Sequence, residues 1–513
     1  MFNTRFLIFL IALLLIACKA DELEVDGAQD SASQPNGAAA ALSEAEYSAL
    51  TPEQQYQVAN KLVGSFYKGV PAIDFFKFDD DISNLKVSGG KEFLSKTRAE
   101  LSQTINNKER ITEEGIPDKD GLVQALERRY DFNEERRPTA EPLAAIREFP
   151  ISRDSFEIWM AYVLANTILF SPAQEIDSAG YIDVQRIHSG LVKAMSKDVS
   201  VRNIILTHMK SQANWRRFRS PEDNTREMIE IYLGLFDKDA DVPKASIACK
   251  NWYLTSEFLD YELVIDVLNE NAVPQQVLGE WVTTCDDFYE VVAQHPLVIT
   301  RITTFLADIF FPNITAETRA EIVTDIVAQN PVYFSDIFLA ILFSREYLLN
   351  NERPKNFEET FFNIAERINW KNQTNFLNQL TNPDSGSPNL HKMKQPSMSL
   401  KLGRFRNQPL DSLSFATFHE AVRERLLIAN NPNSLWGGWD EEFVRDGDIL
   451  SQDTFVHFLF LSVASRVASD EELTTLKTVF DATNNSEDRN DQTRIVFDYL
   501  SRLPELYYLN SIK

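Results

Sequence analysis

Glycine, histidine and cysteine are all scarce in this chain, which has 17 glycines, six histidines and three cysteines among its 513 residues. The sequence also lacks any sustained alternation of valine, isoleucine and threonine, so a large sheet is not expected. Hydrophobic residues recur instead at helical spacing, and they make up 44% of the chain, which is enough for a large core. We therefore predict an all-α fold, a large multi-layered helical domain with long irregular loops.

The motifs of several enzyme classes are missing as well. There is no Cys-x-x-Cys-His haem motif, no glycine-rich phosphate loop and no Gly-x-Ser-x-Gly elbow. His419-Glu420 leads to Arg423 where a zinc protease has its second histidine. The acidic run at 237–241 lacks the glycine and the closing glutamate of a calcium loop. The sequence predicts neither a metal site nor a cofactor.

Positive charge is in short supply, since 51 lysines and arginines face 76 acidic residues and the net charge is −25. Phosphate groups are bound mainly by clustered cations, so a nucleic-acid partner is not expected.

The N-terminus carries the pattern of a bacterial lipoprotein signal peptide. Met1–Arg5 has one positive charge, Phe6–Ala17 is apolar throughout but short for a membrane span, and Cys18 follows the small residue Ala17. We expect cleavage after residues 1–17 and lipid attachment at Cys18, which makes the membrane a partner through the lipid. Lys19 stands where an aspartate would favour inner-membrane retention, so the outer membrane is expected, on its periplasmic or surface face. The alternatives are an uncleaved anchor and an ordinary secretory signal.

Composition divides the rest of the chain into four parts. Residues 18–50 have few large apolar side chains and are predicted to be a disordered tether. A main helical domain is expected at 51–380, beginning at the cap-and-proline pair Thr51-Pro52. Residues 381–413 hold several prolines and basic residues, and they are predicted to form an irregular basic loop. Residues 414–513 are predicted to form a C-terminal helical part packed on the main domain.

The richest polar stretch of the chain runs from Ser211 to Trp252. Ser220 followed by Pro221 predicts a helix start, and the hydrophobic period continues to Leu235. The candidate binding or catalytic residues here are Trp215, Arg217, Glu222, Asp223, Asn224, Arg226 and Glu227. Paired carboxylates beside arginine suit acid–base work on a polysaccharide, but a buried ion-pair network that fixes helix packing is the favoured interpretation.

A second unusual segment has two tryptophans, Trp436 and Trp439, around Gly437-Gly438. Such a pair can stack on a sugar or a peptide, but tryptophans more often hold a loop against the core.

Several of these motifs resemble the bacterial family catalogued as domain of unknown function 1800. The similar positions are Asn224, Arg226 and Glu227, then Ala245–Trp252, Val277-Leu278-Gly279, His295-Pro296 with Arg301, and Phe343–Tyr347 before Pro354. The resemblance covers roughly residues 156–370. Lys250-Asn251-Trp252 replaces the usual threonine-glycine-tryptophan, which indicates a divergent branch. The resemblance implies a helical fold and a secreted location, and it implies no activity.

Cys249 and Cys285 are the other two cysteines, and both lie on predicted helices in an oxidising compartment. A disulfide is favoured there, and two free buried thiols are the alternative.

Two functions follow from these observations. The preferred one is an outer-membrane-anchored binding or assembly protein of the cell envelope, with an envelope protein or a polysaccharide as partner. The alternative is a hydrolase of envelope or extracellular glycan or of peptidoglycan that uses carboxylates near 222–230.

Overall fold

The computed structural model describes residues 37–70, 75–77, 86–87, 92–102, 146, 151–169, 181–255, 261–368, 419, 421–427, 436–437, 444–445, 448–485 and 488–512.

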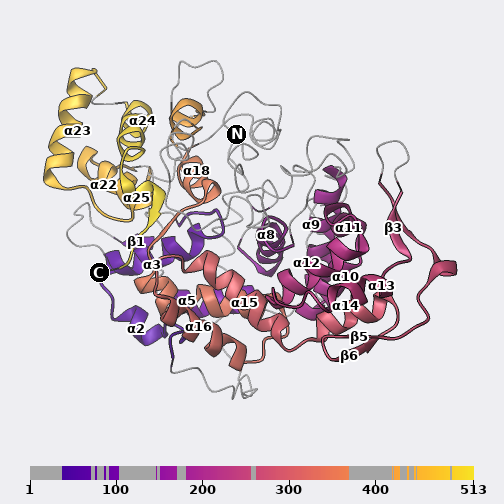
Figure 1. Cartoon of the computed structure of the whole chain (residues 1–513). Coiled ribbons are helices and arrows are strands. Elements are labelled where there is room, and N and C mark those ends of the chain that lie inside the picture. The colour runs from indigo at the N-terminus through magenta and orange to yellow at the C-terminus, as the bar shows by residue number, and fades with distance from the viewer. Residues whose placement is uncertain are drawn as a thin grey trace, which may run out of the picture.

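The described chain is mostly helical (Figure 1). The helices of the first half are α2 (Glu44–Ser48), α3 (Pro52–Gly64), α5 (Phe93–Ser102), α8 (Arg153–Ala165), α9 (Tyr181–Met195), α10 (Val201–Met209), α11 (Gln212–Arg217), α12 (Pro221–Leu233) and α13 (Val242–Ala248). Those of the second half are α14 (Cys285–Gln294), α15 (Leu297–Phe310), α16 (Ala316–Ala328), α17 (Phe334–Leu342), α18 (Phe357–Ala365), α22 (Gln452–Ala464), α23 (Asp470–Ala482), α24 (Arg489–Leu500) and α25 (Pro504–Tyr507), with π-helical turns η4 (Glu346–Asn350) and η6 (Ala421–Leu427).

The strands of the described residues are short and pair only in antiparallel twos, so no closed sheet forms among them. The pairs are β1 (Phe76–Lys77) with β2 (Lys86–Val87), β3 (Trp252–Leu254) with β4 (Leu263–Ile265), β5 (Gln275–Val277) with β6 (Glu280–Val282), β7 (Arg353–Pro354) with β10 (Tyr508–Leu509), and β8 (Val444–Arg445) with β9 (Asp448–Ile449). The prediction of a mainly helical protein is confirmed, and the hairpins at 252–282 were not predicted.

Helix starts follow the capping signals of the sequence. Thr51 and Gln54 form a reciprocal capping box at the start of α3, and the Ser220 hydroxyl accepts the backbone N–H of Asp223 at the start of α12. The end of α12 is set by Gly234, whose φ of +70° suits glycine, and by Arg301, whose Nε donates to the Ile231 carbonyl 3.0 Å away.

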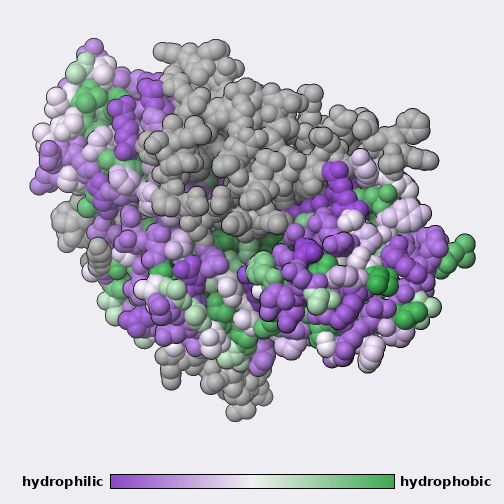
Figure 2. Space-filling model, in the orientation of Figure 1, coloured by the Kyte–Doolittle hydropathy of each residue, from purple (hydrophilic) through white to green (hydrophobic). Residues whose placement is uncertain are grey.

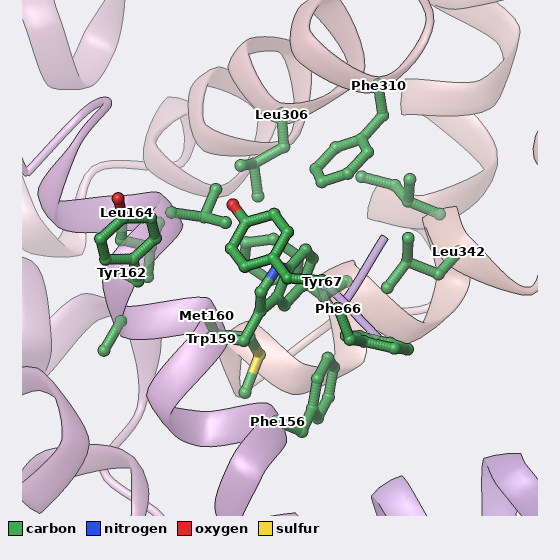
Figure 3. Packing of buried hydrophobic residues seen from close by; sticks show 14 of the residues in the cluster. Phe66, Tyr67, Phe156, Trp159, Met160, Tyr162, Leu164, Leu306, Phe310 and Leu342 are labelled. Atoms are coloured by element: carbon green, nitrogen blue, oxygen red, sulfur yellow. The ribbon is translucent and has the colours of Figure 1, made fainter. Parts of the chain in front are cut away.

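The central core is built around α8, whose side chains are buried on nearly every side. Trp159 of α8 meets Phe66, Phe310 and Phe338 with ring centroids 4.9, 6.2 and 5.4 Å away, so residues far apart in sequence converge on one ring (Figure 3). The apolar run at 156–170 is therefore a core helix over the residues described. No helix of the described residues is long and apolar enough to cross a membrane.

The predicted tether at 18–50 is wrong for its last fourteen residues. The Leu42 amide donates to the Phe343 carbonyl (2.9 Å), the Arg345 amide donates to Ala40 (2.7 Å), and Ala39, Leu42 and Tyr47 are buried. The few apolar residues of this stretch suffice because Leu42 and Tyr47 enter the core and the backbone gains partners from the turn after α17. Residues 18–36 lie outside the described part.

The C-terminal residues share the core with the preceding helices. The Asn60 side-chain amide donates to carbonyls at the end of α22, Asn363 donates to Val463, and β10 pairs with β7. The last helical stretch of the chain is divided into α24 and α25, because Pro504 begins a new helix after Leu503. The basic loop predicted at 381–413 lies outside the described residues.

Candidate functional site

The predicted buried ion-pair network around Arg226 is not what the structure contains. Arg226 lies at the surface, where its guanidinium contacts Asp239 (2.5 Å) and Glu222 (3.6 Å), two side chains that are 79% and 66% exposed. The acid-first spacing of four residues brought Glu222 and Arg226 together, but on the solvent side of the amphipathic helix α12.

Trp215 and Asn224 form part of the interior. Trp215 is fully buried and its ring lies 5.8 Å from that of Trp252, which in turn contacts Tyr289 at 5.6 Å. The Tyr289 hydroxyl donates to Asn224 Oδ1 at 2.9 Å. The candidate binding residues Trp215 and Asn224 therefore tie α11, α12, β3 and α14 together and are closed to a ligand.

The titratable residues that do come together are grouped around Arg217. This guanidinium acts electrostatically on Glu227, His208 and Tyr232, which lie on α12 and α10. Burial, together with the carboxylates of Glu230 and Asp223, raises the pKa of Glu227 to about 7, and Glu227 Oε2 is buried without a hydrogen-bond partner. A carboxyl group whose pKa lies near 7 can both release and take up a proton at physiological pH, so it is suited to proton transfer.

His208 was not among the predicted site residues. Burial and the charge of Arg217 lower the pKa of this imidazole to about 3, so it is neutral at physiological pH, and its Nε2 has no hydrogen-bond partner. Burial also raises the pKa of Asp223. No spacing in the sequence links His208 to Glu227, because they are related only through Arg217, whose charge acts on both in the folded protein.

Of the remaining candidates for binding or lipid attachment, the structure describes only Trp436. Trp436 is half-buried and packs on the hydrophobic core, while Trp439 and Cys18 lie outside the described residues.

Cys249 and Cys285, for which the sequence left two alternatives, are joined by a disulfide with their Cα atoms 4.3 Å apart. Cys249 caps the end of α13 and Cys285 begins α14. The bond therefore closes the base of the segment between them, residues 250–284, which we call the arm.

The arm consists of the hairpins β3–β4 and β5–β6 with the 3₁₀ turn η3 (Val267–Asn269) between them. Leu278 and Gly279 connect β5 to β6, and both have positive φ, of 53° and 88°, as a two-residue type I′ hairpin turn requires. In Figure 1 the arm extends from the helical body at the edge of the molecule.

The base of the arm is fixed to the helices. Val277 and Val282 are fully buried, and β5 and β6 pack on α13 and α14. Arg216 of α11 donates from Nε to the Tyr261 carbonyl (2.7 Å), and the Arg219 guanidinium lies over the Tyr261 ring at 5.5 Å. Arg216 and Arg219 therefore fix the β3–β4 hairpin to the end of α11.

The outer part of the arm exposes large hydrophobic side chains. Leu268 at the tip is 92% exposed and Trp281 is 70% exposed. The other exposed ones are Tyr253, Ile265, Val267 and Val273. Figure 2 shows hydrophobic surface at this projecting end of the molecule. The sequence analysis missed these residues, and the only signal was the Leu278-Gly279 turn between short apolar segments.

No group of histidine, cysteine, aspartate or glutamate placed to hold a metal ion occurs in the part of the chain that the structure describes. Comparison with known proteins adds no relative: no protein family model matches the chain, and neither the curated proteins nor the solved structures contain a match.

Proposed function

We propose that this chain is an outer-membrane lipoprotein, anchored at Cys18, that binds a protein of the cell envelope through its arm. The observation that supports this function is the set of exposed hydrophobic side chains on a segment closed at its base by a disulfide. Large hydrophobic side chains gathered on one exposed segment of a soluble protein often mark an interaction site. A fixed base also lowers the entropy that the arm loses when it docks.

Charge indicates what kind of surface the arm fits. Residues 250–284 hold six acidic residues and one lysine, and Asp266 and Glu270 flank the tip residue Leu268. Such a segment is repelled by an anionic membrane surface, so lipid is a poor ligand. An apolar pocket with basic residues at its rim, on another protein, complements both the side chains and the charge.

The arm can be tested by placing a photo-reactive residue at its tip in living cells. Leu268→p-benzoylphenylalanine is expected to give one discrete protein adduct, because the side chain enters the partner's pocket. The same replacement at Val332, which is half-exposed between α16 and α17, is the matched control and is expected to give none. Once identified, the partner is purified, and Leu268→Asp with Trp281→Asp is expected to weaken its binding at least about tenfold.

Three outcomes would reject the arm as a protein-docking element: equal adducts from both positions, an adduct of this chain with itself, or a purified partner that binds the double variant as well as the wild type. The protein partner would also be rejected if the wild type sediments with anionic vesicles and the double variant does not. The arm would then bind lipid.

The anchor is tested separately. Cys18→Ser is expected to release the protein from membranes into a soluble fraction, because several acyl chains provide the stable attachment. Fractionation with a salt wash measures this, and a variant that still sediments with membranes would require a second anchor.

The group around Arg217 supports a second candidate function, a glycan or peptidoglycan hydrolase. Glu227, with its raised pKa and unpartnered Oε2, is the general acid of this alternative, and Asp223 or Glu230, one helical turn away, is the second carboxylate. Glu227→Gln is expected to abolish release of soluble fragments from peptidoglycan, whereas Glu222→Gln, on the exposed side of the same helix, leaves it unchanged. Absence of turnover by the wild type excludes the alternative.

We further propose that the chain is a divergent member of the family catalogued as domain of unknown function 1800, and that its helices stack in several layers. The resemblance is supported by the roles of its motif residues, since Arg301 caps α12 and Leu278-Gly279 forms a hairpin turn. The layering is supported by α8 and α22, which are buried on nearly all sides. An experimental structure, superposed on a member of that family, tests both statements.

A further inference from the structure

A cavity of about 240 Å³ lies between four segments that are distant in sequence. Its walls come from α3, the start of α18, the end of α22 and the residues that follow α25. Three lysines line it: Lys61 of α3, Lys68 shortly after α3, and Lys355 just before α18. The cavity is separate from the arm and from the group around Arg217.

Two of these lysines, Lys61 and Lys355, lack an ion-pair partner among the described residues. Lys61 is 5% exposed, and its ammonium donates to the carbonyls of Asn351 (2.6 Å) and Asn510 (3.2 Å). Lys355 donates to the carbonyl of Glu505 (3.0 Å). Ammonium groups hydrogen-bonded only to neutral acceptors have no direct counter-ion, which is costly for a buried group such as Lys61.

The two acids that line the cavity are already neutralised by arginines. Glu359 accepts a bidentate pair of hydrogen bonds from Arg353, with N–O distances of 2.8 and 2.5 Å. Glu505 accepts from Arg466 Nε at 3.1 Å. Lys61 and Lys355 are therefore cations of the cavity without a direct counter-ion, in a chain of net charge −25.

We propose that this cavity binds a small dianion, with Lys61 and Lys355 as its two cationic contacts. The volume lies below the usual range for drug-sized ligands, about 300 to 1,000 Å³, so the ligand is small. Ammonium groups act as point charges and donate hydrogen bonds to carboxylate and phosphate oxygens alike. A short dicarboxylate and inorganic phosphate therefore share the required chemistry.

The protonation of the lysines makes this binding pH-dependent. Burial lowers the pKa of Lys61 to about 7, with Arg353 lowering it further and Glu352 and Glu346 opposing. Burial lowers the pKa of Lys355 to about 8, with Glu359 and Glu505 opposing and Arg353 adding to the effect. A bound dianion favours the charged amines, so affinity is expected to fall as pH rises through this range.

Titration calorimetry on the purified protein tests the proposal, with inorganic phosphate and succinate as separate titrants at about pH 6.5 and sodium chloride holding the ionic strength constant. One of the two is expected to bind, and which one does so identifies the source of the anion. Lys355→Gln is expected to weaken binding about tenfold, the loss of one charge-assisted contact. Lys61→Gln is expected to do the same, and Lys355→Gln carries the test by itself if Lys61→Gln fails to fold.

Lys477→Gln is the matched control, because Lys477 pairs with Asp453 at 2.6 Å, outside the cavity. It is expected to bind the dianion as the wild type does. The proposal is overturned if neither anion binds or if Lys355→Gln and Lys477→Gln bind equally. It is also overturned if the affinity for succinate, which is a dianion at both pH values, is the same at about pH 6.5 and about pH 9.

Discussion

Replacing Cys249 and Cys285 together by serine is expected to lower the free energy of unfolding by about 4 kcal/mol. The disulfide joins residues 36 positions apart, and a closed loop of this length removes much of the conformational freedom of the unfolded chain. Both cysteines are buried at the base of the arm, so the serines add a smaller cost in packing. This is a large fraction of the stability of a typical domain.

Urea denaturation of the non-reduced wild type and of the double variant measures this loss. The wild type under a thiol reductant serves as the matched control, since it lacks the bond but keeps both side-chain volumes, and it is expected to approach the variant. A double variant with the denaturation midpoint of the oxidised wild type would show that the bond does not constrain the unfolded chain.

The features that the sequence predicted best are those decided by neighbouring residues. Thr51 and Ser220 cap their helices because the hydroxyl reaches the backbone of the next turn, whatever the rest of the protein does. The apolar run from Phe156 was recognisable as a core helix because it has no polar face. Most of the secondary structure and the position of the core were therefore predictable from interactions between neighbouring residues.

The locations of the charged side chains were not predictable in the same way. Arg226 and Arg353 both lie near acids in sequence, yet Arg226 faces solvent and Arg353 is buried. The difference arises because η4, α18 and the C-terminal strand β10 surround Arg353, and no local pattern contains that packing.

The arm was missed for a related reason. Its strands have three residues each, too few for a periodic pattern, and they are held by the disulfide, by Arg216 and by α13 and α14. The exposure of Leu268 was not predictable either, because a leucine within an apolar segment is ordinarily buried.

Arg353→Met is expected to lower the free energy of unfolding by about 3 to 5 kcal/mol, because it leaves a buried carboxylate without its cation. The side chains of Arg353 and Glu359 are 7% and 5% exposed, and Arg353 also donates to the Tyr347 hydroxyl at 3.1 Å. The charge of Glu359 raises the pKa of Arg353 against the effect of burial. Glu359 further accepts the Asn356 amide at the start of α18, so the loss of the arginine disturbs a helix start as well.

Thermal and urea denaturation of a matched pair of arginine variants separates a buried ion pair from an exposed one. Arg226→Leu removes a guanidinium of the same kind from α12, where water and two exposed acids surround it, and its melting temperature is expected to stay close to that of the wild type. Adding Glu359→Gln to Arg353→Met is expected to recover part of the loss, since the second change removes the uncompensated charge. If Arg353→Met and Arg226→Leu shift the melting temperature equally, the Arg353–Glu359 pair is not what stabilises the junction of η4, α18 and β10.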